Sequence, residues 1–356
     1  MNSGSVMLVG GPASGKTNYI ARLWLAFQAR KGVLRADRLP TNIHYVDDAV
    51  RHLMTLRFAP RSQRNIEDGR RDFVIEVRVN GGTGPEREIC VPDITGELWK
   101  RAVDTYELPQ EWIDDLRRSS SAILFVRALS KFNVQPMDWV TARDVLKMHA
   151  SAMGEDVDDH DDHDDHDDHD DYDEDDEEQE AVAGASVRVQ DTAAGPGPPA
   201  DKAATDPSQD EPVEERKLAD PATPGTHKLP AQVAFCELLR YLSLLLSDRP
   251  DGSKPRVAIV VTAWDMLDKQ AREAGPMQYL KNQFPFFAGR IQTPGRLEIE
   301  TFGMSIVGGN LRGNSAFRES LKGRDLSEVG YTAVMKNGVM VEDPDVTLPV
   351  AWALGD

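Results

Sequence analysis

The sequence predicts an α/β fold with a mostly parallel sheet, one antiparallel hairpin strand and helices on both faces. Short apolar runs, typical of buried strands, alternate with stretches of helical periodicity. The first apolar run ends in glycines and leads directly into a helical pattern. An acidic and Pro/Ala/Gly-rich stretch interrupts the alternation in the middle of the chain, and regular patterns resume after it.

Each element is predicted from its own pattern. Strands are expected where apolar residues cluster in short runs, and two of these runs are joined by a glycine-containing turn that predicts a hairpin. The expected strands are residues 5–11, 71–79, 86–93, 121–129, 256–264 and 297–305. Helices are expected where apolar residues recur at helical spacing. The expected helices are residues 16–29, 46–56, 109–117 and 229–247.

The central interruption carries all of the chain's excess negative charge. The 356 residues include 60 acidic and 41 basic side chains, with a formal net charge of −19. Residues 155–180 hold 19 of the acidic residues and no Lys or Arg, so the rest of the chain is neutral and gives no reason to expect direct nucleic-acid binding. We expect residues 151–228 to be a disordered insert between two parts of one domain, residues 1–150 and residues 229–356 with a C-terminal extension.

Within this insert, four histidines recur every three residues among aspartates, at positions 160, 163, 166 and 169. His and carboxylate side chains suit Zn²⁺, Ni²⁺ or Cu²⁺. A period of three, however, does not keep ligands on one face of a helix with 3.6 residues per turn. A solvated spacer, an acidic docking surface for a basic partner and weak metal binding all remain open.

The sequence gives no indication of export or membrane insertion. The N-terminus lacks the basic and then apolar segments of a signal peptide. The most apolar predicted helix, near residues 233–246, is too short and too polar to span a bilayer. Cys90 and Cys236 lack CxxC spacing and fit a reducing compartment. We therefore expect a cytoplasmic protein.

Residues 10–17, GGPASGKT, match the phosphate-binding pattern GxxxxGK[ST] at every fixed position. They lie between a predicted strand and a predicted helix, which is the setting that this motif requires. Glycines such as Gly10 and Gly15 let backbone N–H groups face phosphate oxygens, and the helix N-terminus adds partial positive charge. Lys16 is predicted to bind the β- and γ-phosphates, and the Thr17 hydroxyl is predicted to bind Mg²⁺.

Two further motifs follow predicted strands. DITG (residues 93–96) places Asp93 where a carboxylate can hold Mg²⁺ through water and Gly96 where an N–H can bind the γ-phosphate, although an ordinary turn has the same composition. TAWD (residues 262–265) ends in Asp265. Its carboxylate can accept hydrogen bonds from N1 and N2 of guanine, a donor pair that adenine lacks. A helix N-cap is the alternative role.

The order of these motifs resembles that of a Ras-like GTPase domain. The stretches GGPASGKT, VPDITGELW and VVTAWDML are similar to TRAFAC-type GTPases of the bacterial double-GTPase group, which is associated with multi-gene conflict (anti-phage) systems. The resemblance covers residues 5–130 and 229–309. It implies a Ras-like P-loop NTPase fold and a molecular switch that binds and hydrolyses GTP with Mg²⁺. The partners that it implies are another GTPase subunit and an effector.

The resemblance also implies roles for single residues. Ser305 would lie in the loop that covers the base, and Ser62, or less favourably Thr55, would supply the switch hydroxyl to Mg²⁺. The expected nucleotide contacts are Gly10, Ser14, Gly15, Lys16, Thr17, Asn18, Gly96, Thr262, Asp265 and Ser305. The expected metal contacts are Thr17, Asp93 and Ser62, and the expected catalytic residues are Lys16, Glu97 and Ser62.

Three residues depart from the Ras-like pattern. Ala263 replaces the Lys whose stem packs on the base, which weakens the expected guanine selectivity. Ser62 replaces Thr and keeps the hydroxyl. Glu97 replaces Gln, and its carboxylate can orient water but would lie near the triphosphate charge. We therefore expect slow hydrolysis, with Arg101 or an arginine finger from a partner completing the site.

Three other functions remain open on the sequence alone. The chain could be a P-loop ATPase or kinase, in which TAWD is only a helix cap. It could be an inert scaffold that binds nucleotide for stability. It could also buffer metal ions through its His-rich run. Preference for ATP that survives Asp265→Ala would favour the ATPase, and turnover lost in Lys16→Ala would exclude the scaffold.

Overall fold

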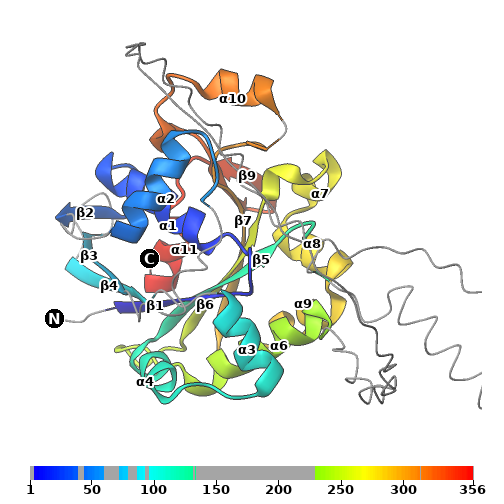
Figure 1. Cartoon of the computed structure of the whole chain (residues 1–356). Helices are drawn as coiled ribbons and strands as arrows, with labels where there is room; N and C mark the ends of the chain where they lie inside the picture. The colour runs from blue at the N-terminus through cyan, green and yellow to red at the C-terminus, as the bar shows by residue number, and fades with distance from the viewer. Residues whose placement is uncertain are drawn as a thin grey trace, which may run out of the picture. The chain divides into compact units, whose positions relative to one another are not determined.

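The computed structural model describes residues 4–38, 44–59, 72–78, 86–92, 96–130, 133, 229–312 and 314–355. Within these ranges, nine strands form one sheet in the order β2-β3-β4-β1-β5-β6-β7-β8-β9 (Figure 1). The strands are β1 Gly4–Val9, β2 Arg35–Arg38, β3 Asp72–Arg78, β4 Glu86–Pro92, β5 Ser121–Arg127, β6 Arg256–Thr262, β7 Glu298–Ser305, β8 Tyr331–Lys336 and β9 Val339–Asp343.

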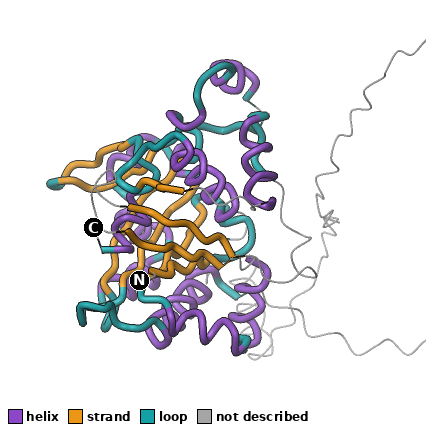
Figure 2. Tube along the Cα trace, turned by 90° about the vertical axis from the view of Figure 1, so that its left-hand side faces the viewer, coloured by secondary structure: helices purple, strands orange, loops and turns teal. Residues whose placement is uncertain are grey.

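Helices cover both faces of this sheet, as Figure 2 shows. The α-helices are α1 Lys16–Gln28, α2 His44–Met54, α3 Gly96–Thr105, α4 Gln110–Arg118, α6 Ala231–Leu245, α7 Lys269–Ala274, α8 Pro276–Gln283, α9 Pro285–Gln292, α10 Ser315–Leu321 and α11 Leu348–Leu354. Two 3₁₀ turns, η3 Trp264–Met266 and η4 Leu326–Glu328, lie between them.

The centre of the sheet is parallel and buried on both sides. Strands β4, β1, β5, β6 and β7 pair in parallel. Along β1, Val6 and Leu8 join a core with residues of α1, α2 and α11, whereas Met7 and Val9 join a core with residues of α3, α6 and α9. In β1, β5 and β6, burial on both faces explains why the sequences are continuous apolar runs. The predicted α/β class with a mostly parallel central sheet is confirmed.

The antiparallel part of the sheet is larger than the sequence analysis predicted. The predicted hairpin is present as β3 and β4. The expectations of a single antiparallel hairpin strand and of a last strand ending at residue 305 were wrong, because β2, β8 and β9 also pair antiparallel. Asn337 and Gly338 connect β8 to β9 with φ values of 51° and 78°. Positive φ at both positions matches the right-handed twist of a two-residue hairpin.

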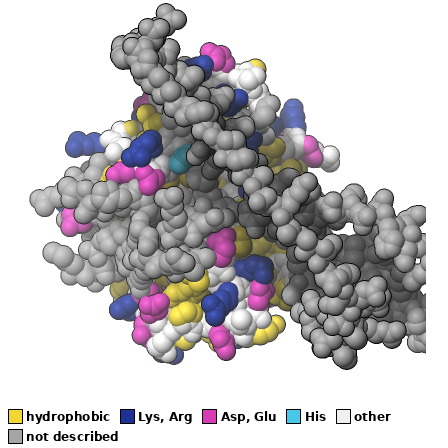
Figure 3. All heavy atoms as spheres, viewed as in Figure 1, with side chains coloured by type: hydrophobic (Ala, Val, Ile, Leu, Met, Phe, Trp, Pro, Cys, Tyr) yellow, Lys and Arg dark blue, Asp and Glu magenta, His cyan; other side chains and the backbone are white. Residues whose placement is uncertain are grey.

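The predicted apolar helix at 229–247 is confirmed as α6. Its inner face buries Phe235, Leu238 and Leu242 in the core that it shares with α9. Among the described helices, none has the length and apolar character needed to cross a membrane. The predicted insert, residues 151–228, lies outside the described residues. On the face seen in Figure 3, the basic and acidic side chains of the described residues are interspersed.

Candidate functional site

The phosphate-binding motif forms the connection between β1 and α1. Gly15 precedes the first helical residue and has φ 95°, a left-handed conformation that glycine adopts without a steric penalty. The Lys16 ammonium donates to the carbonyl oxygens of Gly10 at 2.6 Å and Gly11 at 3.2 Å, and to Ser14 Oγ at 3.3 Å. The ammonium therefore lies inside the curve of the loop. Thr17 follows in the first turn of α1 and is half-buried.

Gly96 lies directly against this loop. A Cβ atom added to Gly96 would be 2.4 Å from the carbonyl oxygen of Gly11 and 2.5 Å from the nitrogen of Pro12, so only glycine fits without movement of the backbone. Gly96 is also the first residue of α3, and Glu97 follows it as an exposed side chain. The structure thus brings together the two motifs that the sequence analysis assigned to phosphate.

The candidate base-binding residues lie at the ends of β6 and β7. Ser305 Oγ donates to Asp265 Oδ1 at 2.5 Å and accepts from the N–H of Gly308 at 2.9 Å. Ser305 is fully buried, whereas Asp265 is partly exposed. The buried hydroxyl therefore fixes the direction of a carboxylate that solvent can reach. Thr262 Oγ1 donates to the carbonyl oxygen of Ser14 at 2.8 Å, which ties the end of β6 to the phosphate-binding loop.

The alternative role of Asp265 as a helix N-cap is wrong. Asp265 lies inside the turn η3, and the residue that precedes this turn is Ala263. The next helix, α7, has Asp268 as its N-cap, and the Asp268 carboxylate accepts from the N–H of Ala271 at 2.8 Å. Capping is thus assigned to a different aspartate three residues later.

The two halves of the candidate site share one edge of the sheet. β1, β5, β6 and β7 are neighbours in that order; the phosphate loop and Asp265 follow the carboxyl ends of β1 and β6, and Ser305 is the last residue of β7. Ligands of open parallel sheets bind in the crevice outside this edge. A molecule with phosphates at β1 and a base at β6 and β7 would therefore span the ends of four adjacent strands.

Two expected metal contacts lie outside the described residues. Ser62 is in the undescribed range 60–71, and Asp93 lies between Pro92, the end of β4, and Gly96. The expected donors, the hydroxyls of Thr17 and Ser62 and the carboxylate of Asp93, are hard oxygen ligands that suit Mg²⁺. In the chain, Asp93 follows β4, which pairs in parallel with β1, and precedes Gly96, which lies beside the phosphate-binding loop. This order agrees with the expected role of Asp93 as a metal ligand near the phosphates.

Asn18 has a different partner from the expected one. Its side-chain oxygen accepts from the N–H of Ala59 at 3.0 Å. The side chain therefore holds the segment after α2 against the start of α1. A direct contact between Asn18 and the nucleotide stays a prediction.

The sequence analysis missed Arg22, which is 1% exposed in the middle of α1. Its Nε and Nη2 donate to the carbonyl oxygen of Val329 at 2.9 and 2.7 Å, and Nη2 also donates to that of Ser327 at 2.9 Å. Burial lowers the pKa of the guanidinium to about 10, against the opposing effect of Asp325 and Asp345, so Arg22 stays charged at neutral pH. A charged residue within the apolar run IARLWLAF was the available indication of a buried, paired side chain.

Arg22 links α1 to the chain that enters β8, where Tyr331 pairs with Ser305. Arg22→Met should lower the free energy of unfolding by about 2 kcal/mol, because it leaves the buried carbonyl groups of Val329 and Ser327 without donors. Urea denaturation measures this loss. Arg51→Met is the matched control: it removes an exposed ion pair with Asp48 and should cost less than about 0.5 kcal/mol. Equal midpoints for the two variants would contradict this role of Arg22.

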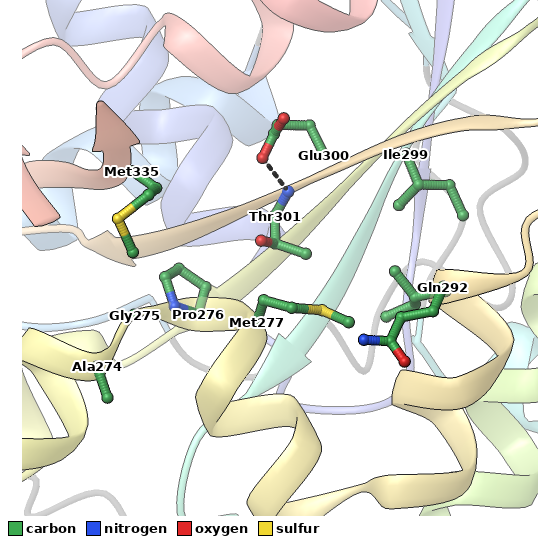
Figure 4. Close-up of a pocket in the computed structure, with 10 residues that line it drawn as sticks. Ala274, Gly275, Pro276, Met277, Gln292, Ile299, Glu300, Thr301 and Met335 are labelled. Carbon is green, nitrogen blue, oxygen red and sulfur yellow. Dashed lines mark hydrogen bonds between the residues drawn. The ribbon is translucent and has the colours of Figure 1, made fainter. Parts of the chain in front are cut away.

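A separate pocket of about 370 Å³ lies between α8, α9, β7 and β8 (Figure 4). Met277, Ile291, Ile299 and Met335 give it a mostly apolar lining, and the one charged residue in that lining is Glu300. The lining contains none of the predicted site residues. A mostly apolar pocket whose one charged lining residue is a glutamate is unsuitable for phosphate. The candidate nucleotide site is therefore at the strand ends and not in this pocket.

Comparison with known proteins agrees with the motifs at the strand ends. No curated protein and no solved structure matches the chain. The family model described as Double-GTPase 1 matches residues 7–353, which includes every candidate site residue named above. The chain is therefore a member of the Double-GTPase 1 family, a family of GTPases.

Proposed function

We propose that this protein binds GTP with Mg²⁺ at the carboxyl edge of its sheet, hydrolyses it slowly and acts as a nucleotide-dependent switch. One observation supports this proposal most strongly. The loop that holds Lys16 contacts Gly96 on one side and Thr262 on the other, while the Ser305 hydroxyl orients Asp265 at the neighbouring strand end. The arrangement provides a cation for phosphate and an oriented carboxylate for guanine.

In this proposal, Lys16 and the N–H groups of the loop bind the β- and γ-phosphates. Thr17, Asp93 and Ser62 would hold Mg²⁺, which neutralises charge that develops on the phosphates. Asp265 accepts from N1 and N2 of guanine, and adenine is rejected because it leaves the carboxylate without its donors. The contact of Ser305 with Asp265 removes the need to order the carboxylate when the base binds.

The switch would act through two segments beside the γ-phosphate. Gly96 begins α3, so a hydrogen bond from its N–H to the γ-phosphate would act directly on the start of that helix. Ser62 would contribute the second contact. Loss of the γ-phosphate removes both contacts and lets the two segments relax.

The direct test is phosphate release from GTP by the purified full chain under single-turnover conditions. We expect slow release in the presence of Mg²⁺ and none after chelation with EDTA, because the metal neutralises the transferred phosphoryl group. Restoration by added Mg²⁺ is the control for damage by the chelator. Equal rates with and without EDTA would contradict metal-dependent hydrolysis.

Glu97 limits hydrolysis in this proposal. Glu97→Gln should raise the single-turnover rate by about 5-fold, because the amide can orient water without placing a second negative charge near the triphosphate. Glu111→Gln, an exposed residue in the first turn of α4, is the matched control and should leave the rate unchanged. A rate for Glu97→Gln equal to or below that of the wild type would refute this role.

We further propose that the protein works in the cytoplasm within a multi-protein bacterial defence system, with another GTPase subunit and an effector as partners. This proposal rests on the resemblance to double-GTPases of anti-phage systems. Phage plaque assays on cells that carry the complete gene cluster test it. The cluster should protect the cells, and Lys16→Ala should remove the protection. Protection that the Lys16 variant retains would contradict the proposed role.

A further inference from the structure

We propose that Arg127 binds the nucleotide between its phosphates and its base and supplies the cationic contact to guanine that Ala263 lacks. This inference rests on the proposed function, because it requires a guanine nucleotide across the strand ends.

The position of Arg127 in the sheet is the first argument. Arg127 is the last residue of β5 and lies opposite Thr262, the last residue of β6. β5 is located between β1, which leads to the phosphate-binding loop, and β6, which leads to Asp265. A nucleotide with phosphates at the loop and its base at Asp265 would therefore pass over the end of β5.

The direction of the side chain is the second argument. Arg127 Nη1 donates to the carbonyl oxygen of Ala13 at 3.1 Å, and Thr262 Oγ1 donates to that of Ser14 at 2.8 Å. Two adjacent strand ends thus bind consecutive carbonyl groups of the phosphate-binding loop. The Arg127 side chain extends along the carboxyl edge toward the loop and is exposed there.

The third argument is the small size of Ala263. This residue follows Thr262 in a left-handed conformation with φ 56°, and its methyl group cannot cover a base. Arg127 lies at the end of β5, next to the end of β6 that Ala263 follows, and its guanidinium contacts the phosphate-binding loop at Ala13. A guanidinium is planar and stacks on aromatic faces with favourable electrostatics, as it would on a purine ring.

The backbone around Arg127 is held in place. Asn133 Nδ2 donates to the carbonyl oxygen of Arg127 at 2.8 Å, and the N–H of Ala128 donates to the carbonyl oxygen of Thr262 at 3.0 Å. The N–H of Leu129 donates to the Tyr279 hydroxyl at 3.4 Å. These bonds fix the backbone from which the side chain extends, and the bond to Ala13 orients the guanidinium, which together lower the entropic cost of the contact.

The test measures the dissociation constants of GDP and of pyrophosphate by calorimetry with the full chain. Arg127→Ala should weaken GDP binding about 10-fold, the loss expected for one partly desolvated cation–π contact, and should change pyrophosphate binding less than about 2-fold. Arg127→Ala combined with Ala263→Lys should recover most of the GDP affinity, because the new Lys stem covers the base from the adjacent strand end. Arg290→Ala is the matched control: Arg290 also donates to a backbone carbonyl, that of Thr293, but on α9.

The outcomes separate the inference from the proposed function. A wild-type chain that does not bind GDP would overturn both. If the wild type binds GDP and Arg127→Ala binds it equally well, only the inference fails. Equal losses of GDP and pyrophosphate affinity would also overturn it, because they would show that Arg127 acts only by shaping the phosphate loop.

Discussion

Lys16→Ala should reduce GTP hydrolysis by at least about 100-fold. The substitution removes the cation that binds the phosphates and stabilises the negative charge that develops on them during hydrolysis. In the structure, the Lys16 ammonium lies inside the loop, 2.6 Å from the carbonyl oxygen of Gly10. Lys16 is the first residue of α1 and the one basic residue of the loop, residues 10–17, so the loop has no second cation that could replace it. Phosphate release under single-turnover conditions gives the rate.

The fold should survive this change, since Lys16 is only partly buried and its hydrogen bonds to Gly10, Gly11 and Ser14 lie within the loop. Lys281→Ala, an exposed Lys of α8, is the control and should leave both hydrolysis and thermal stability unchanged. Hydrolysis by Lys16→Ala at the wild-type rate would show that the chemistry does not take place at this loop.

Asp265→Asn should change the base preference from guanine to xanthine. The carboxylate of Asp265 accepts from N1 and N2 of guanine in our proposal, whereas an asparagine amide can donate to the O2 atom that xanthine has in place of the amino group. We expect the affinity for GTP to fall about 100-fold and that for XTP to rise. Ser305 can still donate to the side-chain oxygen of Asn, so the orientation seen in the structure should be kept.

Competition of GTP and XTP against a fluorescent GDP analogue measures this preference. Asp268→Asn is a close control, because Asp268 lies three residues later and caps α7 through the N–H of Ala271. It should leave the base preference unchanged. Unchanged GTP affinity in Asp265→Asn would place the base elsewhere.

The sequence allowed the central part of the fold and the candidate site to be predicted together. Apolar runs such as those of β1 and β5 are buried on both faces and are therefore recognisable without knowledge of their neighbours. The motifs with Lys16, Gly96 and Asp265 each follow a strand. Because the carboxyl ends of parallel strands meet at one edge, these motifs, which are far apart in the chain, lie at the same edge of the sheet.

The parts that were missed have weaker local patterns. β2 has four residues, three of them charged, and nothing in them indicates an edge strand. The Asn337–Gly338 turn between β8 and β9 was a usable indication of a hairpin, and it was overlooked.

Arg22 and Arg127 were missed for a different reason. Their partners are Val329 and Ala13, which lie 307 and 114 residues away in the chain. A sequence shows that a charge lies in an apolar run, but only the fold shows which carbonyl group it binds.

The central claim is that guanine nucleotides bind across the ends of β1, β5, β6 and β7. Isothermal titration calorimetry of the wild-type full chain with non-hydrolysable analogues of GTP and ATP, in the presence of Mg²⁺, tests it most directly. We expect one site per chain and an affinity for the GTP analogue about 100-fold above that for the ATP analogue, since adenine cannot satisfy Asp265. An ATP analogue that binds as tightly as the GTP analogue, or more tightly, would contradict the claim.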